Sequence, residues 1–120
     1  MIKKVKIGTK EFEMKSSAYT QFKYKNDTGR TLLKDIIKIG KAFNDLNGEF
    51  DIEQYDDLDD FITLSLRIAY IMCLEAKSIS CSFEDFLMQV DDYLQDVNWI
   101  SDVVELATSP FSGIVQTTKN

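Results

Sequence analysis

The most apolar stretch of the chain runs from Phe61 to Leu74, where eleven of fourteen residues are apolar. On a helix with 3.6 residues per turn, these side chains point in nearly every direction, which is typical of a helix surrounded by the rest of the fold or of a membrane span. The stretch would be roughly 21 Å long, shorter than the roughly 30 Å apolar core of a bilayer, and Arg67 lies at its middle. The pattern therefore predicts a central core helix at about residues 58–77.

A different pattern precedes it at residues 3–14, where apolar side chains alternate with charged ones at Val5, Ile7, Phe12 and Met14. A period of two, interrupted by the turn residues 8–10, predicts a small β-hairpin with one face on the core. Because an isolated hairpin is only marginally stable in water, we expect it to lie on the helices or to pair with another chain.

Capping residues mark two helices between the hairpin and the central helix. The pair Ser16-Ser17 offers an N-cap for the first, and Gly29 is the expected left-handed residue at its end. Thr31 can cap the second. The apolar face of this second helix consists of Leu32, Leu33, Ile36, Ile37 and Ile39, prolonged by Phe43 and Leu46.

Two further helices are expected after the central one. Ser82, with Asp85 three residues on, resembles a capping box for a helix whose apolar positions continue from Phe83 to Val97. Asn98 can cap a shorter helix from Trp99 to about Ala107, which Ser109-Pro110 ends. The sequence thus predicts a mainly α protein with a single domain over residues 1–109, a helical bundle around the central helix, and a flexible C-terminal tail at residues 110–120.

Charge is unevenly distributed along the chain, whose net charge is -6. Residues 1–30 carry eight basic and three acidic side chains, whereas the other ninety residues carry six basic and seventeen acidic ones. This polarity suits copies that dock head-to-tail, or a protein that meets a charged partner at each end, although a solvated surface with chance asymmetry gives the same counts. The acidic main body argues against binding to a nucleic acid backbone.

Candidate chemistry is sparse in this sequence. Histidine is absent, which excludes Ser-His-Asp, Cys-His and zinc sites built on His. Cys73 and Cys81 do not form a C-x-x-C pair, and the glycines are isolated rather than grouped in a phosphate-binding loop. We therefore expect no enzyme activity, no cofactor and no metal. With no signal-like N-terminus and no membrane-spanning stretch, we expect a cytoplasmic protein.

Two charged features have both a structural and a functional interpretation. The acidic run at residues 49–60 does not fit a calcium loop, because Asp56 stands where glycine is needed and Ile62 stands where glutamate is needed. Its carboxylates are expected to favour the N-terminal end of the central helix. Arg67 is either an ion-pair anchor or interface contact, or a long side chain whose head reaches water.

One segment is similar to a known family. Ser16-Ser17-Ala18 leading to Tyr24-Lys25, followed by residues 29–36, Gly-Arg-Thr-Leu-Leu-Lys-Asp-Ile, resembles the N-terminal signature of tail assembly chaperones of long-tailed phages and prophage-like elements of Gram-positive bacteria. The later order, an apolar helix with Ala69-Tyr70 and then an acidic helical region, is also similar. The resemblance covers roughly residues 1–107.

The resemblance implies a non-enzymatic, helix-rich protein of the host cytoplasm that is absent from the mature virion. Such chaperones bind the tape measure protein, a long helical chain, and keep it soluble while tail tube subunits assemble. Many are made in two lengths by ribosomal frameshifting, for which the tail from Pro110 is a plausible position.

A tape measure segment would bind as an amphipathic helix in an apolar groove. Because little chain follows them, the candidate groove residues are Trp99, Ile100, Val103 and Phe111. The alternative is that they complete the core. The alternative function is a small acidic regulatory or inhibitor protein that mimics nucleic acid toward a basic host protein, with residues 49–60 and 91–102 as the mimic.

Overall fold

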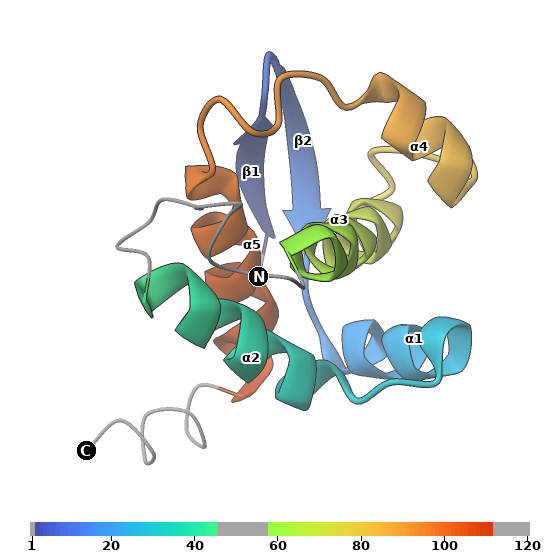
Figure 1. The fold of residues 1–120 in the computed structure, drawn as a ribbon. Coiled ribbons are helices and arrows are strands. Elements are labelled where there is room, and N and C mark those ends of the chain that lie inside the picture. The colour runs from blue at the N-terminus through green and yellow to red at the C-terminus, as the bar shows by residue number, and fades with distance from the viewer. Residues whose placement is uncertain (1, 46–57, 112–120) are drawn as a thin grey trace.

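The computed structural model describes residues 2–45 and 58–111 (Figure 1). It is mainly α with an N-terminal antiparallel hairpin, so the predicted fold class is confirmed. The elements in chain order are β1 (Ile2–Ile7), β2 (Lys10–Lys15), α1 (Ala18–Thr28), α2 (Leu32–Asp45), α3 (Leu58–Glu75), α4 (Phe83–Gln89), α5 (Asn98–Thr108) and the short 3-10 turn η1 (Ser109–Phe111).

Helix α3 is the centre of the fold, as its apolar sequence predicted. Every residue from Ile68 to Cys73 is buried, and the helix packs against β2, α1, α2, α4 and α5. It ends two residues earlier than expected, because Lys77 adopts a left-handed backbone and the N–H of Ser78 turns back to the carbonyl of Cys73. Over residues 68–73, α3 therefore has partners on all sides, which is why no single stripe marked its buried face.

The hairpin lies on the helices, with β2 against α3 and β1 against α5 (Figure 1). Its register places Val5 opposite Phe12, and its buried face consists of Val5, Ile7, Phe12 and Met14, the four residues that the alternation indicated. The ring of Phe12 meets that of Phe86 edge-on at 5.3 Å between centroids. Tertiary contacts of this kind supply the stability that an isolated two-stranded sheet lacks.

The turn of the hairpin docks on the segment that follows α4. Gly8 has a φ of +63°, and a Cβ added there would collide with the backbone carbonyl of Asp91. The backbone N–H of Thr9 donates to the Asp91 carboxylate at 3.0 Å, and the Thr9 hydroxyl donates to it at 2.7 Å. Glycine is therefore required both by the backbone conformation and by the close approach.

One prediction in this region is wrong. The apolar spacing from Phe83 to Val97 indicated one long helix, but α4 ends at Gln89 and Val90 is extended (φ -83°, ψ 125°). Asp92 has a positive φ of 45°. The helix thus ends just before Asp91, whose contact with Thr9 joins residues 82 positions apart, and apolar spacing does not reveal such a contact.

The predicted caps at the other helix ends are mostly confirmed. Ser17 accepts the N–H of Tyr19 at 3.1 Å and begins α1, Gly29 is left-handed with a φ of 73°, and Ser82 accepts the N–H of Asp85. The predicted cap of α5 is wrong: Asn98 is the first helical residue and its N–H donates to the carboxylate of Asp96 at 2.9 Å.

Residues 46–57 and 112–120 lie outside the described residues, so the structure does not bear on Leu46, on most of the acidic run or on most of the predicted tail. The first two residues of that tail, Pro110 and Phe111, belong to η1. Among the described helices, none combines the length and apolarity needed to cross a membrane. Cys73 is buried in α3, where burial raises the pKa of its thiol to about 12, and Cys81 is half-buried.

Candidate functional site

The candidate groove residues of the last helix lie in the core. Trp99 is 2% exposed, Ile100 and Val103 are fully buried, and the Trp99 indole N–H donates to the Tyr93 carbonyl at 2.8 Å. Phe111 is half-buried in η1. The expectation of an open groove assumed that only chain following α5 could cover it, whereas α5 packs against β1, α2 and α3, which all precede it. These residues complete the core here, and a role in binding a partner stays a prediction.

The acidic segment at residues 91–102 is partly engaged within the molecule. Asp91 accepts hydrogen bonds from Thr9, and Asp102 pairs with the ammonium of Lys3 at 3.5 Å. Asp96 accepts the N–H of Asn98, as described above. Several carboxylates that a nucleic acid mimic would present to its target thus already have partners in this chain.

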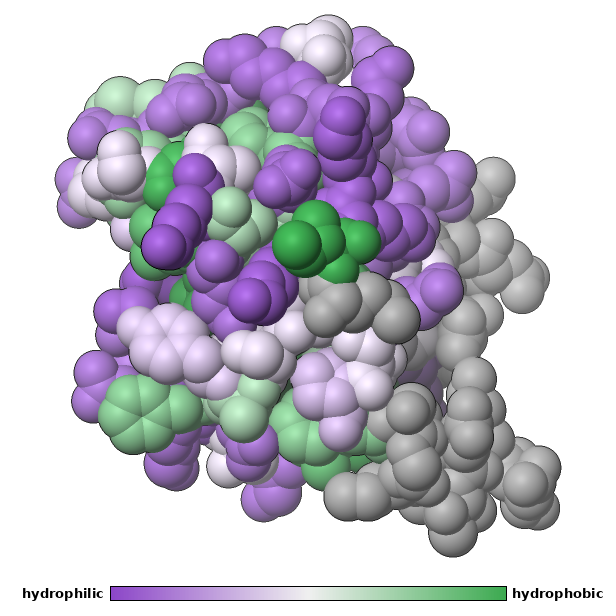
Figure 2. Space-filling view, turned by 180° about the vertical axis from the view of Figure 1, so that it is seen from behind, coloured by the Kyte–Doolittle hydropathy of each residue, from purple (hydrophilic) through white to green (hydrophobic). Residues whose placement is uncertain are grey.

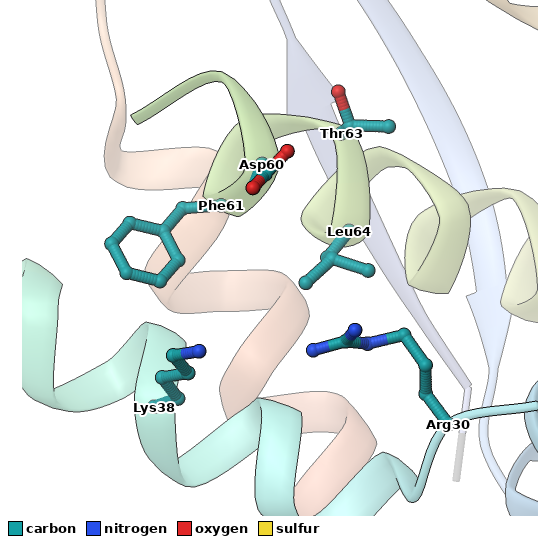
Figure 3. A pocket seen from close by; sticks show the side chains of 6 residues that line it. All are labelled: Arg30, Lys38, Asp60, Phe61, Thr63 and Leu64. Carbon is teal, nitrogen blue, oxygen red and sulfur yellow. The ribbon is translucent and has the colours of Figure 1, made fainter. Parts of the chain in front are cut away.

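A pocket of about 270 Å³ opens between α2 and α3 (Figure 3). Its lining combines two cations, one carboxylate, one hydroxyl and two apolar side chains: Arg30, Lys38, Asp60, Thr63, Phe61 and Leu64. Figure 3 shows Phe61 and Leu64 projecting from α3 toward α2, with Lys38 and Arg30 reaching toward them from the opposite side. The ammonium of Lys38 lies 6.0 Å from the centroid of the Phe61 ring. We take this pocket as the candidate functional site.

Arg30 is fixed beside the pocket by a buried carboxylate. Its Nε donates to one oxygen of Asp35 at 2.7 Å and its Nη2 to the other at 3.0 Å. The hydroxyl of Tyr24 donates to the same carboxylate at 2.6 Å. Tyr24 is fully buried and Asp35 is 4% exposed, so an arginine with a half-exposed side chain is anchored to the interior of the fold.

The donors around Asp35 are sufficient to keep its buried carboxylate ionised. Burial alone would raise the pKa of Asp35, but the hydrogen bonds from Arg30 and Tyr24 outweigh it, and the pKa lies below the usual 3.8. Burial, and then the hydrogen bond to Asp35, raise the pKa of the Tyr24 hydroxyl. The hydrogen bond to Asp35 raises the pKa of Arg30. All three groups keep their neutral-pH protonation states, so the network is a fixed support.

Local sequence produces this arrangement. Gly29 ends α1 with a left-handed turn, the chain reverses, and α2 then brings Asp35 back within reach of Arg30 and Tyr24. These residues belong to the same segment that carries the family resemblance. These residues served in the sequence only as a motif, but they also carried a signal for the network: an arginine five residues before a carboxylate at the start of an apolar helix.

A row of basic side chains continues from the pocket along α2. Lys34, Lys38 and Lys41 follow one another at spacings of four and three residues on α2, so they lie on one face of the helix. Arg30 lies just before the helix, and all four side chains are exposed. We call them the α2 basic stripe. Ile37, 56% exposed, lies on the same face.

With the lysines of the stripe included, the basic part of the chain extends to residue 41 and not only to residue 30. Residues 1–41 carry eleven basic and four acidic residues, a net charge of +7, and residues 42–120 carry three basic and sixteen acidic ones, a net charge of -13. The earlier boundary at residue 30 had left these lysines in the acidic part. The first two helices and the hairpin thus form a more strongly basic unit than the sequence analysis recognised.

Arg67 has a packing role in the described structure. Its guanidinium lies 4.0 Å from the centroid of the Phe83 ring, and the side chain is half-buried. This geometry is a cation–π contact that helps hold α4 on α3. The sequence did not indicate this contact, and the ion pair, interface contact or water-exposed head considered for Arg67 stay predictions.

Within the described residues, no group of three or more His, Cys, Asp or Glu side chains is arranged to hold a metal ion. Comparisons with protein-family models, curated proteins and solved structures find no match to this chain.

Proposed function

We propose that the protein is a tail assembly chaperone of a long-tailed phage or prophage, which binds the tape measure protein in the host cytoplasm and keeps it soluble while tail tube subunits assemble. The resemblance over residues 16–36 suggests the family, and the helical fold with its basic hairpin agrees with that pattern. The observation that carries the proposal is the pocket, in which apolar Phe61 and Leu64 lie beside an arginine anchored by residues of the resembling segment.

The chemistry of this pocket indicates the kind of partner segment that it would take. A pocket of about 270 Å³ is smaller than most small-molecule sites, which span roughly 300–1,000 Å³, and suits one anchoring side chain. An apolar side chain of an amphipathic helix would enter against Leu64, while acidic residues on the same helix would meet the α2 basic stripe. Exposed Ile37 would extend the apolar contact.

Electrostatic attraction would steer the partner, and apolar burial would shield the surface that makes an isolated tape measure segment aggregate. The proposal therefore specifies an acidic amphipathic helix as the bound segment.

Co-expression with tape measure fragments tests this proposal. The wild-type protein should raise the soluble yield of fragments that contain acidic amphipathic helices. Lys38→Glu should reduce that yield, because it reverses a charge at the rim of the pocket. Lys77→Glu makes the same change at an exposed residue just after α3, outside the stripe, and should leave the yield unchanged.

Equal solubility of the fragments with and without the wild-type protein would refute the chaperone function. If Lys38→Glu and Lys77→Glu behaved alike while the wild type was active, the chaperone function would stand and the pocket would not be its site.

A further inference from the structure

Two of the most exposed apolar side chains of the described residues lie side by side on α1. Phe22 is 66% exposed and Tyr19 is 50% exposed, and their ring centroids are 6.2 Å apart. Being three residues apart, they occupy one face of the helix. Figure 2 shows green and pale side chains over α1 at the lower left, bordered by purple ones. We call Tyr19 and Phe22 with their neighbour Lys25 the α1 patch.

The charge beside these rings is mainly positive. Lys25 lies one turn after Phe22 and is exposed, as is Lys15 just before the helix. The one acidic residue of α1, Asp27, is paired with Lys23 at 3.2 Å. An apolar residue that binds here would therefore be best accompanied by carboxylates.

A second exposed apolar residue has the opposite surroundings. Met88 on α4 is 81% exposed, and Glu84 and Asp85, which lie four and three residues before it, occupy the same face and are exposed. Asp92 follows shortly after the helix and is exposed as well. We call Met88 with Glu84 and Asp85 the α4 patch.

Both patches belong to helices that pack on α3. In projection, α1 and α4 lie toward the same edge of the molecule, at the right of Figure 1, with the end of α3 between them. Neither patch includes the pocket, which lies between α2 and α3. The two patches are thus free of the surface assigned above to a tape measure helix.

We propose that the α1 patch of one copy binds the α4 patch of a second copy. Each patch offers what the other lacks: aromatic rings beside lysine on one, and a flexible thioether beside carboxylates on the other, an arrangement in which sulfur–aromatic contact and charge pairing act together. Two α1 patches, or two α4 patches, would bring like charges together, so the contact joins unlike surfaces. This inference does not depend on the proposed function.

A contact of this size is weak, because each side contributes few large side chains compared with a standard interface. It would become populated at high local concentration, for example when several copies bind one long chain. If both contacts of a pair form at once, the assembly closes as a dimer; otherwise it continues to larger species.

Sedimentation velocity of the purified chain over a wide concentration range provides the test. The wild type should show a sedimentation coefficient that rises with concentration. Phe22→Ser and Met88→Ser should each weaken association at least about tenfold, the loss expected for removal of a central contact residue. Ile37→Ser is the matched control, because Ile37 is similarly exposed but lies on α2, and it should not change association.

Charge reversal sharpens the test. Lys25→Glu and Glu84→Lys should each reduce self-association about two- to fivefold, the effect of one exposed ion pair. An equimolar mixture of the two variants should recover it, since the altered α1 patch then meets the altered α4 patch. All these positions are exposed, so unchanged circular dichroism and thermal midpoint should accompany each variant.

A sedimentation coefficient that stays monomeric at every concentration would overturn the proposal. Loss of self-association in Ile37→Ser would also overturn it, because the contact would then lie on α2. So would a mixture of the two charge variants that did not restore self-association.

Discussion

Two carboxylates hold this fold together in different surroundings. Asp35 is buried and accepts one hydrogen bond from Tyr24, eleven residues away in sequence, and two from Arg30, five residues away. Asp91 is exposed and accepts from the backbone and hydroxyl of Thr9, eighty-two residues away. One closes a local corner between α1 and α2, and the other attaches the hairpin turn to the segment after α4.

The two carboxylates differ in whether water can replace their hydrogen bonds. If Asp35 lost its charge, Tyr24 and Arg30 would lose the carboxylate that they share. Water can reach half-exposed Arg30 but not buried Tyr24, and breaking one partner of a buried network is costly for this reason. If Asp91 lost its charge, water could solvate Thr9, and the exposed contact would lose little energy directly. The Asp91 segment instead restricts geometry, because its backbone carbonyl lies where a Cβ at position 8 would be and so requires glycine there.

The largest expected effect is that of Asp35→Asn. An amide cannot accept from two arginine donors and a tyrosine as a carboxylate does, so the free energy of unfolding should fall by about 3 kcal/mol. Urea denaturation followed by circular dichroism measures it. Asp102→Asn, which removes an exposed pairing with Lys3, is the control and should cost at most about 1 kcal/mol. Equal losses in the two variants would contradict the importance of burial.

Gly8→Ala should have the next largest effect, a loss of about 2 kcal/mol, because it combines a left-handed backbone with a steric clash. Gly29→Ala is a matched control: Gly29 has a similar φ of +73° but nothing within 4 Å of an added Cβ, so it should lose only about 1 kcal/mol of backbone strain. Hydrogen exchange should also be faster around Thr9 in Gly8→Ala. Similar losses in both variants would show that Asp91 does not constrain the turn.

Tyr24→Phe tests the buried network more gently. It removes one donor but leaves Asp35 its two bonds with Arg30, so the unfolding free energy should fall by about 1 kcal/mol. Tyr19→Phe removes the same hydroxyl from an exposed ring and should change nothing measurable. A loss in Tyr24→Phe as large as in Asp35→Asn would mean that the tyrosine, and not the arginine, is the main partner.

The smallest effect is expected from Asp91→Asn at neutral pH, and pH should reveal it. Backbone and side-chain hydrogen bonds from Thr9 hold the pKa of Asp91 below 3.8. A carboxylate with a lowered folded-state pKa stabilises fully above its unfolded pKa, and this contribution is lost as pH falls through the folded value. The unfolding free energies of wild type and Asp91→Asn should therefore converge below pH 3.8. A gap that widens on acidification would contradict the sign of this shift.

The sequence predicted those features that depend on neighbouring residues. The hairpin followed from alternation, α1 from the caps at Ser17 and Gly29, and α3 from its apolar run. Each of these signals lies within a few residues of the structure that it produces, so no knowledge of the rest of the fold is needed.

Features that depend on distant residues could not be predicted. Apolar spacing near Val90 does not show that α4 ends there, and the contact that Asp91 makes just beyond it is with the distant Thr9. Trp99 and Val103 were assigned to a groove because the covering strand and helices precede them in the chain. The pocket required Phe61 and Arg30 to meet across two helices. Periodicity shows that a face is apolar but not which partner covers it.

The alkylation rates of the two thiols can report how often different parts of the molecule open. With Cys73 buried at the centre of α3 and its pKa raised to about 12, almost none of it is the reactive thiolate at neutral pH, so an alkylating reagent can modify it only when the core opens. Half-buried Cys81, whose carbonyl accepts the Tyr70 hydroxyl, reports instead on release of the segment between α3 and α4. The alkylation rate of Cys73 thus reports global unfolding, and that of Cys81 reports local unfolding. A ligand that slowed only the alkylation of Cys81 would reveal that it binds near the segment between α3 and α4.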